Sequence, residues 1–186
     1  MLVGLVSNNI TNSMTFSLYL SPLSLSSPTT ATSQIIFGGI DPSLYQGTLY
    51  EFDTWGDEYY YVQISGINVT STGESLFNGD APYFILVDSG TVQIILPQDQ
   101  ADAIGKLAKA TYQTSSNLID NYFTCNCSDV PWDDSLTFTL FGQLEIEIPW
   151  LDIVNKNTGV EGQCIIPITY EQHPGGGILV SLVGRD

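Results

Sequence analysis

One short segment of the sequence has the residue types and spacing of a catalytic turn. Four apolar residues, 84–87, precede Asp88, and Ser89-Gly90-Thr91 follows it. The apolar run predicts a strand that delivers the carboxylate to a tight turn. Gly90 allows the backbone to pass close to the carboxylate, and the hydroxyls of Ser89 and Thr91 are suited to bond to it locally. A carboxylate held in this way can do general acid or base chemistry, although Asp-Ser-Gly is also an ordinary β-turn sequence.

Most of the remaining chain predicts strands and turns that would position this segment. We expect strands, from alternating or continuous apolar and β-branched residues, at 15–20, 34–37, 59–64, 67–69, 83–87, 92–96, 121–124, 136–141, 144–148 and 163–168. The run 83–87 is expected to be buried on both faces. One helix is predicted near residues 98–110, because Ala101, Ile104, Leu107 and Ala108 share a face. The aromatic residues Trp55, Tyr59, Tyr60 and Tyr61 are expected to serve the core and strand pairing. The fold class is therefore all-β with one short helix after the turn.

The composition excludes several classes of protein. The chain has 186 residues, enough for one domain or two small ones, and 43% of them are hydrophobic, which excludes a disordered acidic tail. Four Lys and Arg against twenty Asp and Glu give a net charge of -16, which argues against nucleic-acid binding. No apolar run is long enough to span a bilayer, and the amino-terminal segment lacks the basic region of a signal peptide. The charge repels itself less as carboxylates protonate, so the composition fits an acid-adapted protein as well as a generic extracellular one.

Several segments, in this order, resemble the C-terminal half of the pepsin-like aspartic proteases, and most closely the fungal candidapepsin- and yapsin-like branch. The segments that carry the resemblance are Phe16-Ser17-Leu18-Tyr19-Leu20, Ile36-Phe37-Gly38-Gly39-Ile40-Asp41 with Tyr45-Gln46-Gly47, Tyr60-Tyr61-Val62-Gln63-Ile64 with Ile67-Asn68-Val69, Leu86-Val87-Asp88-Ser89-Gly90-Thr91, and Leu96-Pro97 with the helix after it. The resemblance covers residues 5–166, and residues 167–186 diverge. It implies that residues 1–186 form a single C-terminal lobe, an all-β pepsin-like barrel.

The resemblance also implies an activity, aspartic-type endopeptidase. Two aspartates share a proton, one acting as general base on a water and the other polarising the scissile carbonyl of a peptide or protein substrate. Asp88 matches the aspartate that the C-terminal lobe contributes, and Ser89, Gly90 and Thr91 match its turn. Val92 stands where the family has a second hydroxyl residue. Neither a metal nor a cofactor is implied.

The second catalytic aspartate is not found, because no other Asp-(Ser/Thr)-Gly occurs in the chain. We therefore expect a lobe truncated at both ends and inactive by itself, which needs the N-terminal lobe, or a second copy, to complete the dyad. A non-catalytic peptide-binding or structural β-domain derived from this lobe is the alternative.

The cysteines and sequons concern covalent modification. Cys127 and Cys164 match the family's disulfide and leave Cys125 unpaired, while a bond between Cys125 and Cys164 is the alternative pairing. A disulfide and the family together imply an extracellular or cell-surface location for the full-length protein. Of three Asn-X-Ser/Thr sequons, those at Asn9 and Asn68 are candidate glycosylation sites, and the third begins at Asn126. The lone histidine, His173, is expected to lie in a solvated loop.

Overall fold

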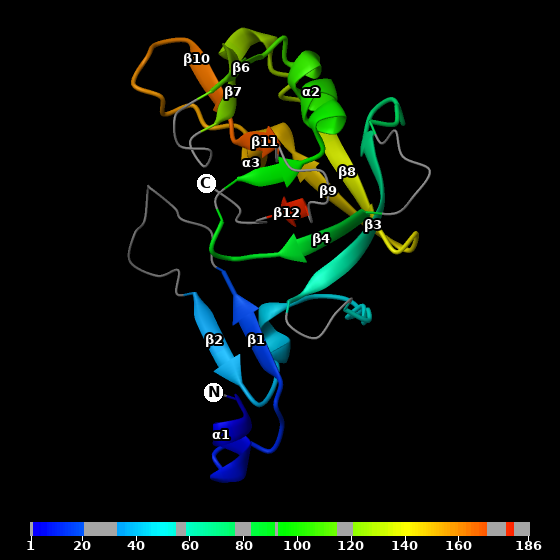
Figure 1. The fold of residues 1–186 in the computed structure, drawn as a ribbon, viewed down its shortest axis with the longest axis vertical. Helices are drawn as coiled ribbons and strands as arrows, with labels where there is room; N and C mark the ends of the chain where they lie inside the picture. Colours follow the sequence, from blue (N-terminus) through cyan, green and yellow to red (C-terminus); the bar gives the residue numbers. More distant parts are fainter. Residues whose placement is uncertain are drawn as a thin grey trace. The chain divides into compact units, whose positions relative to one another are not determined.

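The computed structural model describes residues 2–20, 33–54, 59–76, 83–91, 93–114, 121–170 and, for the backbone alone, 178–180. They belong to two compact units, one containing residues up to Tyr50 and the other containing residues Glu51–Val183. Strands provide most of the regular structure of the described residues, so the predicted all-β fold class is confirmed (Figure 1). Trp55, Val92 and His173 lie outside the described residues.

The first unit is built on a two-stranded antiparallel sheet. Strand β1 (Phe16–Tyr19) pairs with β2 (Gln34–Phe37), and a short helix, α1 (Leu2–Ser7), precedes them. Gly38 follows β2 with φ +85°, and a Cβ at this position would lie 2.8 Å from the Cβ of Thr11. Only glycine satisfies both conditions, which explains the Gly after this strand. A 3-10 helix, η1 (Pro42–Leu44), comes next and is capped by the carboxylate of Asp41, which accepts a bond from the Ser43 amide at 2.9 Å.

The second unit is built around a mixed sheet. Among the described residues its seven strands run in the order β11-β5-β12-β4-β3-β8-β9. Their bounds are β3 (Tyr61–Val69), β4 (Tyr83–Val87), β5 (Ile94–Leu96), β8 (Ser135–Leu140), β9 (Leu144–Pro149), β11 (Ile168–Tyr170) and β12 (Ile178–Val180). Strand β12 pairs in parallel with β4 and antiparallel with β5, so it separates two strands that are close in sequence (Figure 1).

Two predicted strands are a single strand in the structure. Residues 59–64 and 67–69 were expected as separate strands, but β3 runs continuously across Ser65 and Gly66. The pairing of β3 with β8 shifts between Ile64 and Gly66, so the irregularity that looks like an interruption in the sequence is a bulge.

The helix predicted after the Asp88 turn forms but ends earlier, at Leu107. Helix α2 (Gln98–Leu107) has Pro97 at its N-cap, Asp99 in its first turn and Lys106 in its last turn, in agreement with the helix dipole. Ala101, Ile104 and the following glycine, Gly105, are buried. The structure also has a short helix that the sequence did not indicate, α3 (Trp150–Ile153).

A second, three-stranded sheet has the order β10-β7-β6 among the described residues, with β6 (Thr111–Gln113), β7 (Tyr122–Asn126) and β10 (Gln163–Ile166). A 3-10 helix, η3 (Cys127–Asp129), follows β7. The core of the second unit joins both sheets with the helices. Its fully buried side chains include Ile64, Ile67, Ile104, Leu136, Trp150, Ile166 and Ile168.

Candidate functional site

Strand β4 delivers Asp88 to the middle of the larger sheet. Leu86 of β4 lies opposite Tyr61 of β3 on one side and Leu179 of β12 on the other. The expectation that this strand is buried on both faces is wrong. Ile85 is buried, but Val87 is 47% exposed. A continuous apolar run does not reveal how many neighbours cover each face, and here the strand emerges from the core as it reaches Asp88.

The turn after β4 binds both oxygens of the Asp88 carboxylate. The backbone N–H of Gly90 donates to Oδ1 at 2.8 Å, and the hydroxyl of Thr91 donates to Oδ2 at 2.7 Å. A Cβ on residue 90 would lie 3.2 Å from Oδ1, a close approach that favours glycine. Ser89 was expected to bond to the carboxylate as well, but within the described turn only the hydroxyl of Thr91 does so.

These two donors make Asp88 a stronger acid than an ordinary aspartate. The hydrogen bond from the Thr91 hydroxyl, followed by that from the Gly90 amide, holds the pKa of Asp88 below its usual value, and partial burial opposes this only weakly. Both donors are neutral, and no second carboxylate among the described residues is a cause of this pKa shift. The site as described is one ionised carboxylate, fixed in orientation and half-buried.

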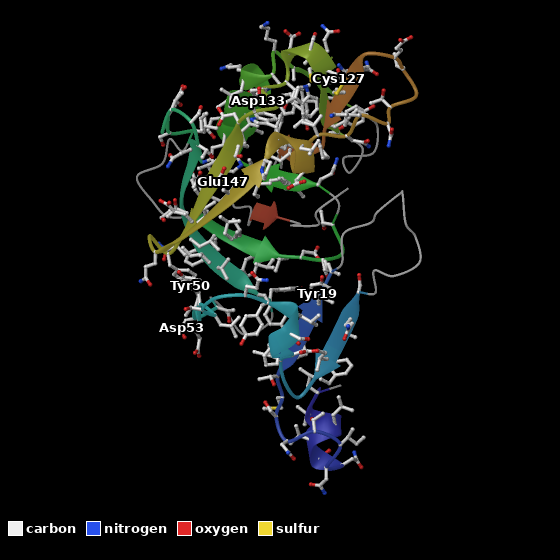
Figure 2. The ribbon with its side chains drawn as sticks, turned by 180° about the vertical axis from the view of Figure 1, so that it is seen from behind. Tyr19, Tyr50, Asp53, Cys127, Asp133 and Glu147 are labelled. Carbon is white, nitrogen blue, oxygen red and sulfur yellow. A yellow bond between two sulfur atoms is a disulfide. The ribbon has the colours of Figure 1, made fainter. Side chains whose placement is uncertain are left out.

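The cysteines occupy a different part of the second unit. Cys127 and Cys164 form a disulfide, the pairing that the resemblance implied, and Cys125 is a buried free thiol directly opposite Cys164 in the sheet. Burial, and secondly the negative charge of Asp129, raise the pKa of the Cys125 thiol. The indole N–H of Trp132 donates to the carbonyl of Cys127 at 2.8 Å, so Trp132 is a neighbour of the disulfide. Cys127 is labelled in Figure 2.

The two candidate glycosylation residues have different settings. Asn9 lies just after α1, is exposed and has φ +56°. Asn68 lies within β3 and lines a groove of about 400 Å³, together with Val69, Thr70, Gly73, Thr137, Glu145 and Glu147. Sequence reasoning missed this groove, although the alternation Glu145-Ile146-Glu147 was a signal that one face of the strand is polar.

The aromatic group was expected to serve the core and strand pairing. Tyr60 does take part in pairing, because the backbone N–H of Val87 donates to its carbonyl at 3.1 Å, but neither Tyr59 nor Tyr60 belongs to the core. Tyr59 and Tyr60 are 56% and 53% exposed. Tyr59 contacts Tyr61 edge-on with ring centroids 5.9 Å apart, so the exposed ring makes a local aromatic contact instead.

Comparison with known proteins gives a consistent set of similarities. A family model described as eukaryotic aspartyl protease matches residues 2–181. Candidapepsin-2 of Candida parapsilosis is 30% identical over 136 residues, covering 73% of this chain and 31% of that protein. Secreted aspartic protease 10 of Candida albicans is 26% identical over 94% of this chain and 35% of its own length. Human gastricsin is 29% identical over 84% of this chain and 37% of its own length.

The chain thus spans about a third of the length of these relatives. Within the described ranges, none of the helices has the length and apolar character that crossing a membrane requires.

Proposed function

Because this chain belongs to the eukaryotic aspartyl protease family, we propose that it supplies half of the active site of an aspartic endopeptidase, with Asp88 as its catalytic carboxylate. The observation that carries this proposal is the Asp88 turn. The two carboxylate oxygens of Asp88 each accept one short hydrogen bond, from the Gly90 N–H at 2.8 Å and from the Thr91 hydroxyl at 2.7 Å. The substrate is a peptide or protein.

Asp88 acts as the general base of the pair. The hydrogen bonds from Thr91 and Gly90 favour its ionised form, so in the dyad the shared proton is expected to reside on the second carboxylate. The ionised carboxylate takes a proton from a bound water, which attacks the scissile carbonyl while the protonated partner polarises the carbonyl oxygen. The pair titrates as a unit, so its two apparent pKa values belong to the dyad.

Gly90 and Thr91 are positioning residues in this scheme. Their donors fix the plane of the Asp88 carboxylate, so that it does not have to reorient when the water approaches. The turn therefore provides pre-organisation, which lowers the barrier by removing the need to order the base during the reaction.

In this proposal the second carboxylate of the dyad comes from outside this chain, because no other Asp-(Ser/Thr)-Gly occurs in its sequence. We therefore expect the chain alone to be catalytically silent, and a complementary N-terminal lobe to complete the dyad. Two observations support an extracellular or cell-surface location for the whole protein. Cys127 and Cys164 form a disulfide, and the chain is similar to secreted aspartic protease 10 of Candida albicans.

A peptide-cleavage assay at acidic pH tests the proposal. The purified chain is assayed alone and after refolding with the N-terminal lobe of candidapepsin-2, with a pepstatin-type inhibitor as the specificity control. We expect no turnover by the chain alone, inhibitor-sensitive turnover by the mixture, and none when the mixture contains Asp88→Asn. Turnover by the monomeric chain alone, or an active mixture with Asp88→Asn, would overturn the assignment.

A further inference from the structure

One face of strands β3, β8 and β9 is polar and open to solvent. Asn68 lies opposite Thr137 on β8, and Thr137 lies opposite Glu147 on β9, so the three residues form a row across the strands. Residues on the other side of the same strands, including Ile67, Val69, Leu136 and Phe138, are buried in the core. Because side chains alternate along a strand, the row containing Asn68 must face water.

The groove on this face has polar walls. Glu145 and Glu147 are exposed, and the hydroxyls of Thr70 and Thr137 bond to each other at 2.8 Å. Its volume of about 400 Å³ is within the range of sites that hold small molecules, about 300–1,000 Å³. Carboxylates are pure acceptors and hydroxyls are both donors and acceptors, a combination that complements the hydroxyl groups of a sugar.

The side chain of Asn68 is available for covalent attachment of a sugar. The side-chain amide of Asn68 makes no hydrogen bond with the described residues, and the side chain lines the groove from within β3. Asn68-Val69-Thr70 is a sequon. Asn68 and Val69 are the last two residues of β3 and Thr70 follows directly, so Asn68 and Thr70 project toward the same face. A sugar attached to Asn68 would therefore break no side-chain hydrogen bond of the described residues.

The sequon at Asn126 also begins at the end of a strand, β7, but its residues are already engaged in other contacts. The Asn126 amide donates to the Asp129 carboxylate at 3.4 Å, and the next residue, Cys127, is committed to the disulfide. Asn9 is exposed, but it follows a helix and does not line the groove.

We propose that Asn68 is an N-glycosylation site and that its first sugar lies in the groove between the loop after β3 and the strands β8 and β9. The donor is an oligosaccharide on a polyprenyl diphosphate carrier, used by the transferase of a secretory pathway. A bond forms between the anomeric carbon and Nδ2 of Asn68. The anomeric carbon–oxygen bond to the diphosphate breaks, the diphosphate leaves with the electron pair, and Nδ2 loses one proton. This inference is independent of the catalytic role of Asp88.

The first test is site occupancy. The full chain is secreted from a yeast host behind an added leader, and its peptides are analysed by mass spectrometry after enzymatic deglycosylation in heavy-oxygen water. We expect the label at Asn68 in the wild type and in Thr70→Ser, and none at Asn68 in Thr70→Ala. An unmodified Asn68 in secreted wild-type protein would refute the site. The wild-type measurement and the conservative Thr70→Ser variant keep the test decisive if Thr70→Ala fails to fold.

The second test is the groove. The rate at which an endoglycosidase trims the Asn68 glycan is compared in native and urea-unfolded protein, using a denaturant-resistant enzyme. A sugar held in the groove is trimmed at least several-fold more slowly in the native protein, whereas Glu147→Ala should narrow this difference. Equal rates in native and unfolded protein would show that the sugar projects into solvent and would overturn the groove assignment. Neither test depends on peptidase activity, so their failure is distinct from that of the catalytic proposal.

Discussion

Gly105 in helix α2 provides a stringent test of how this helix packs against Phe123. A Cβ at this position would lie 2.6 Å and 2.7 Å from two ring carbons of Phe123 on β7. Carbon atoms attract each other at about 3.5–4.0 Å, so these contacts are strongly repulsive. Phe123 is only 3% exposed, and its ring has no solvent side into which it can move.

Two effects of Gly105→Ala oppose each other. Alanine improves the helix propensity by about 1 kcal/mol relative to glycine. Overpacking a filled core costs about 1–3 kcal/mol, and two ring contacts this short correspond to the upper part of that range. We therefore expect the free energy of unfolding to fall by about 1–2 kcal/mol in a urea titration followed by tryptophan fluorescence.

The neighbouring exposed residue provides the matched control. Lys106→Ala changes the same helix without touching Phe123, and should alter stability by no more than about 0.5 kcal/mol. Combining Gly105→Ala with Phe123→Leu should recover part of the loss, because the smaller side chain leaves room for the new methyl group. If Gly105→Ala is as stable as the wild type, the argument from close packing is refuted.

Three further predictions concern the Asp88 turn, the disulfide and the carboxylate of Asp134. Thr91→Val removes the hydroxyl that donates to Oδ2 of Asp88, so the pKa of Asp88 should rise toward its ordinary value in a carbon NMR titration. Thr91→Ser keeps a hydroxyl and should leave the lowered pKa unchanged. An unchanged pKa in Thr91→Val would refute the role of the hydroxyl. Cys164→Ser removes the disulfide and should lower the free energy of unfolding by roughly 4 kcal/mol, while Cys125→Ser, which breaks no covalent bond, should cost much less; similar losses would argue against the entropic account. Asp134 accepts bonds from the Ser71 amide at 3.0 Å and hydroxyl at 2.6 Å and from the Ser135 amide at 2.8 Å, which lower its pKa. The ionised Asp134 carboxylate contributes about 1 kcal/mol to the free energy of unfolding at pH values above its unfolded pKa of about 3.9, and this contribution is lost as the pH falls through the lower pKa of the folded state. Asp134→Asn should therefore reduce the decline of the free energy of unfolding below about pH 4. An unaltered pH profile would contradict this.

The strands were predictable where the sequence states a periodicity. Leu144–Pro149 alternates between apolar and acidic residues, and β9 has the corresponding half-buried and exposed faces. The helix after Pro97 was predictable for the same reason, with its cap and its charge pattern. In contrast, α1 and α3 have six and four residues, too short for a helical period to emerge from composition.

Burial was less predictable than secondary structure. The run Tyr83–Val87 and the residues Tyr59 and Tyr60 are equally apolar or aromatic in the sequence, but their exposure is decided by which distant strands cover them. The same limit applies to the site. The sequence identifies Asp88 and its local donors because they are within three residues of one another, whereas the groove at Asn68 is assembled from β3, β8 and β9, whose pairing no local pattern specifies.

The position of β12 has a consequence for the order in which the molecule is made. Strands β4 and β5 end at Val87 and Leu96, but the strand that joins them edge to edge begins only at Ile178. A ribosome therefore synthesises the turn at Asp88 long before the chain has made β12, the strand that lies between β4 and β5. Such distant pairing slows folding, because the entropy of a long loop is lost before the contact forms. During this interval the edges of β4 and β5 that β12 will cover remain open to other strands, so we expect the nascent chain to depend on chaperone protection next to the Asp88 turn.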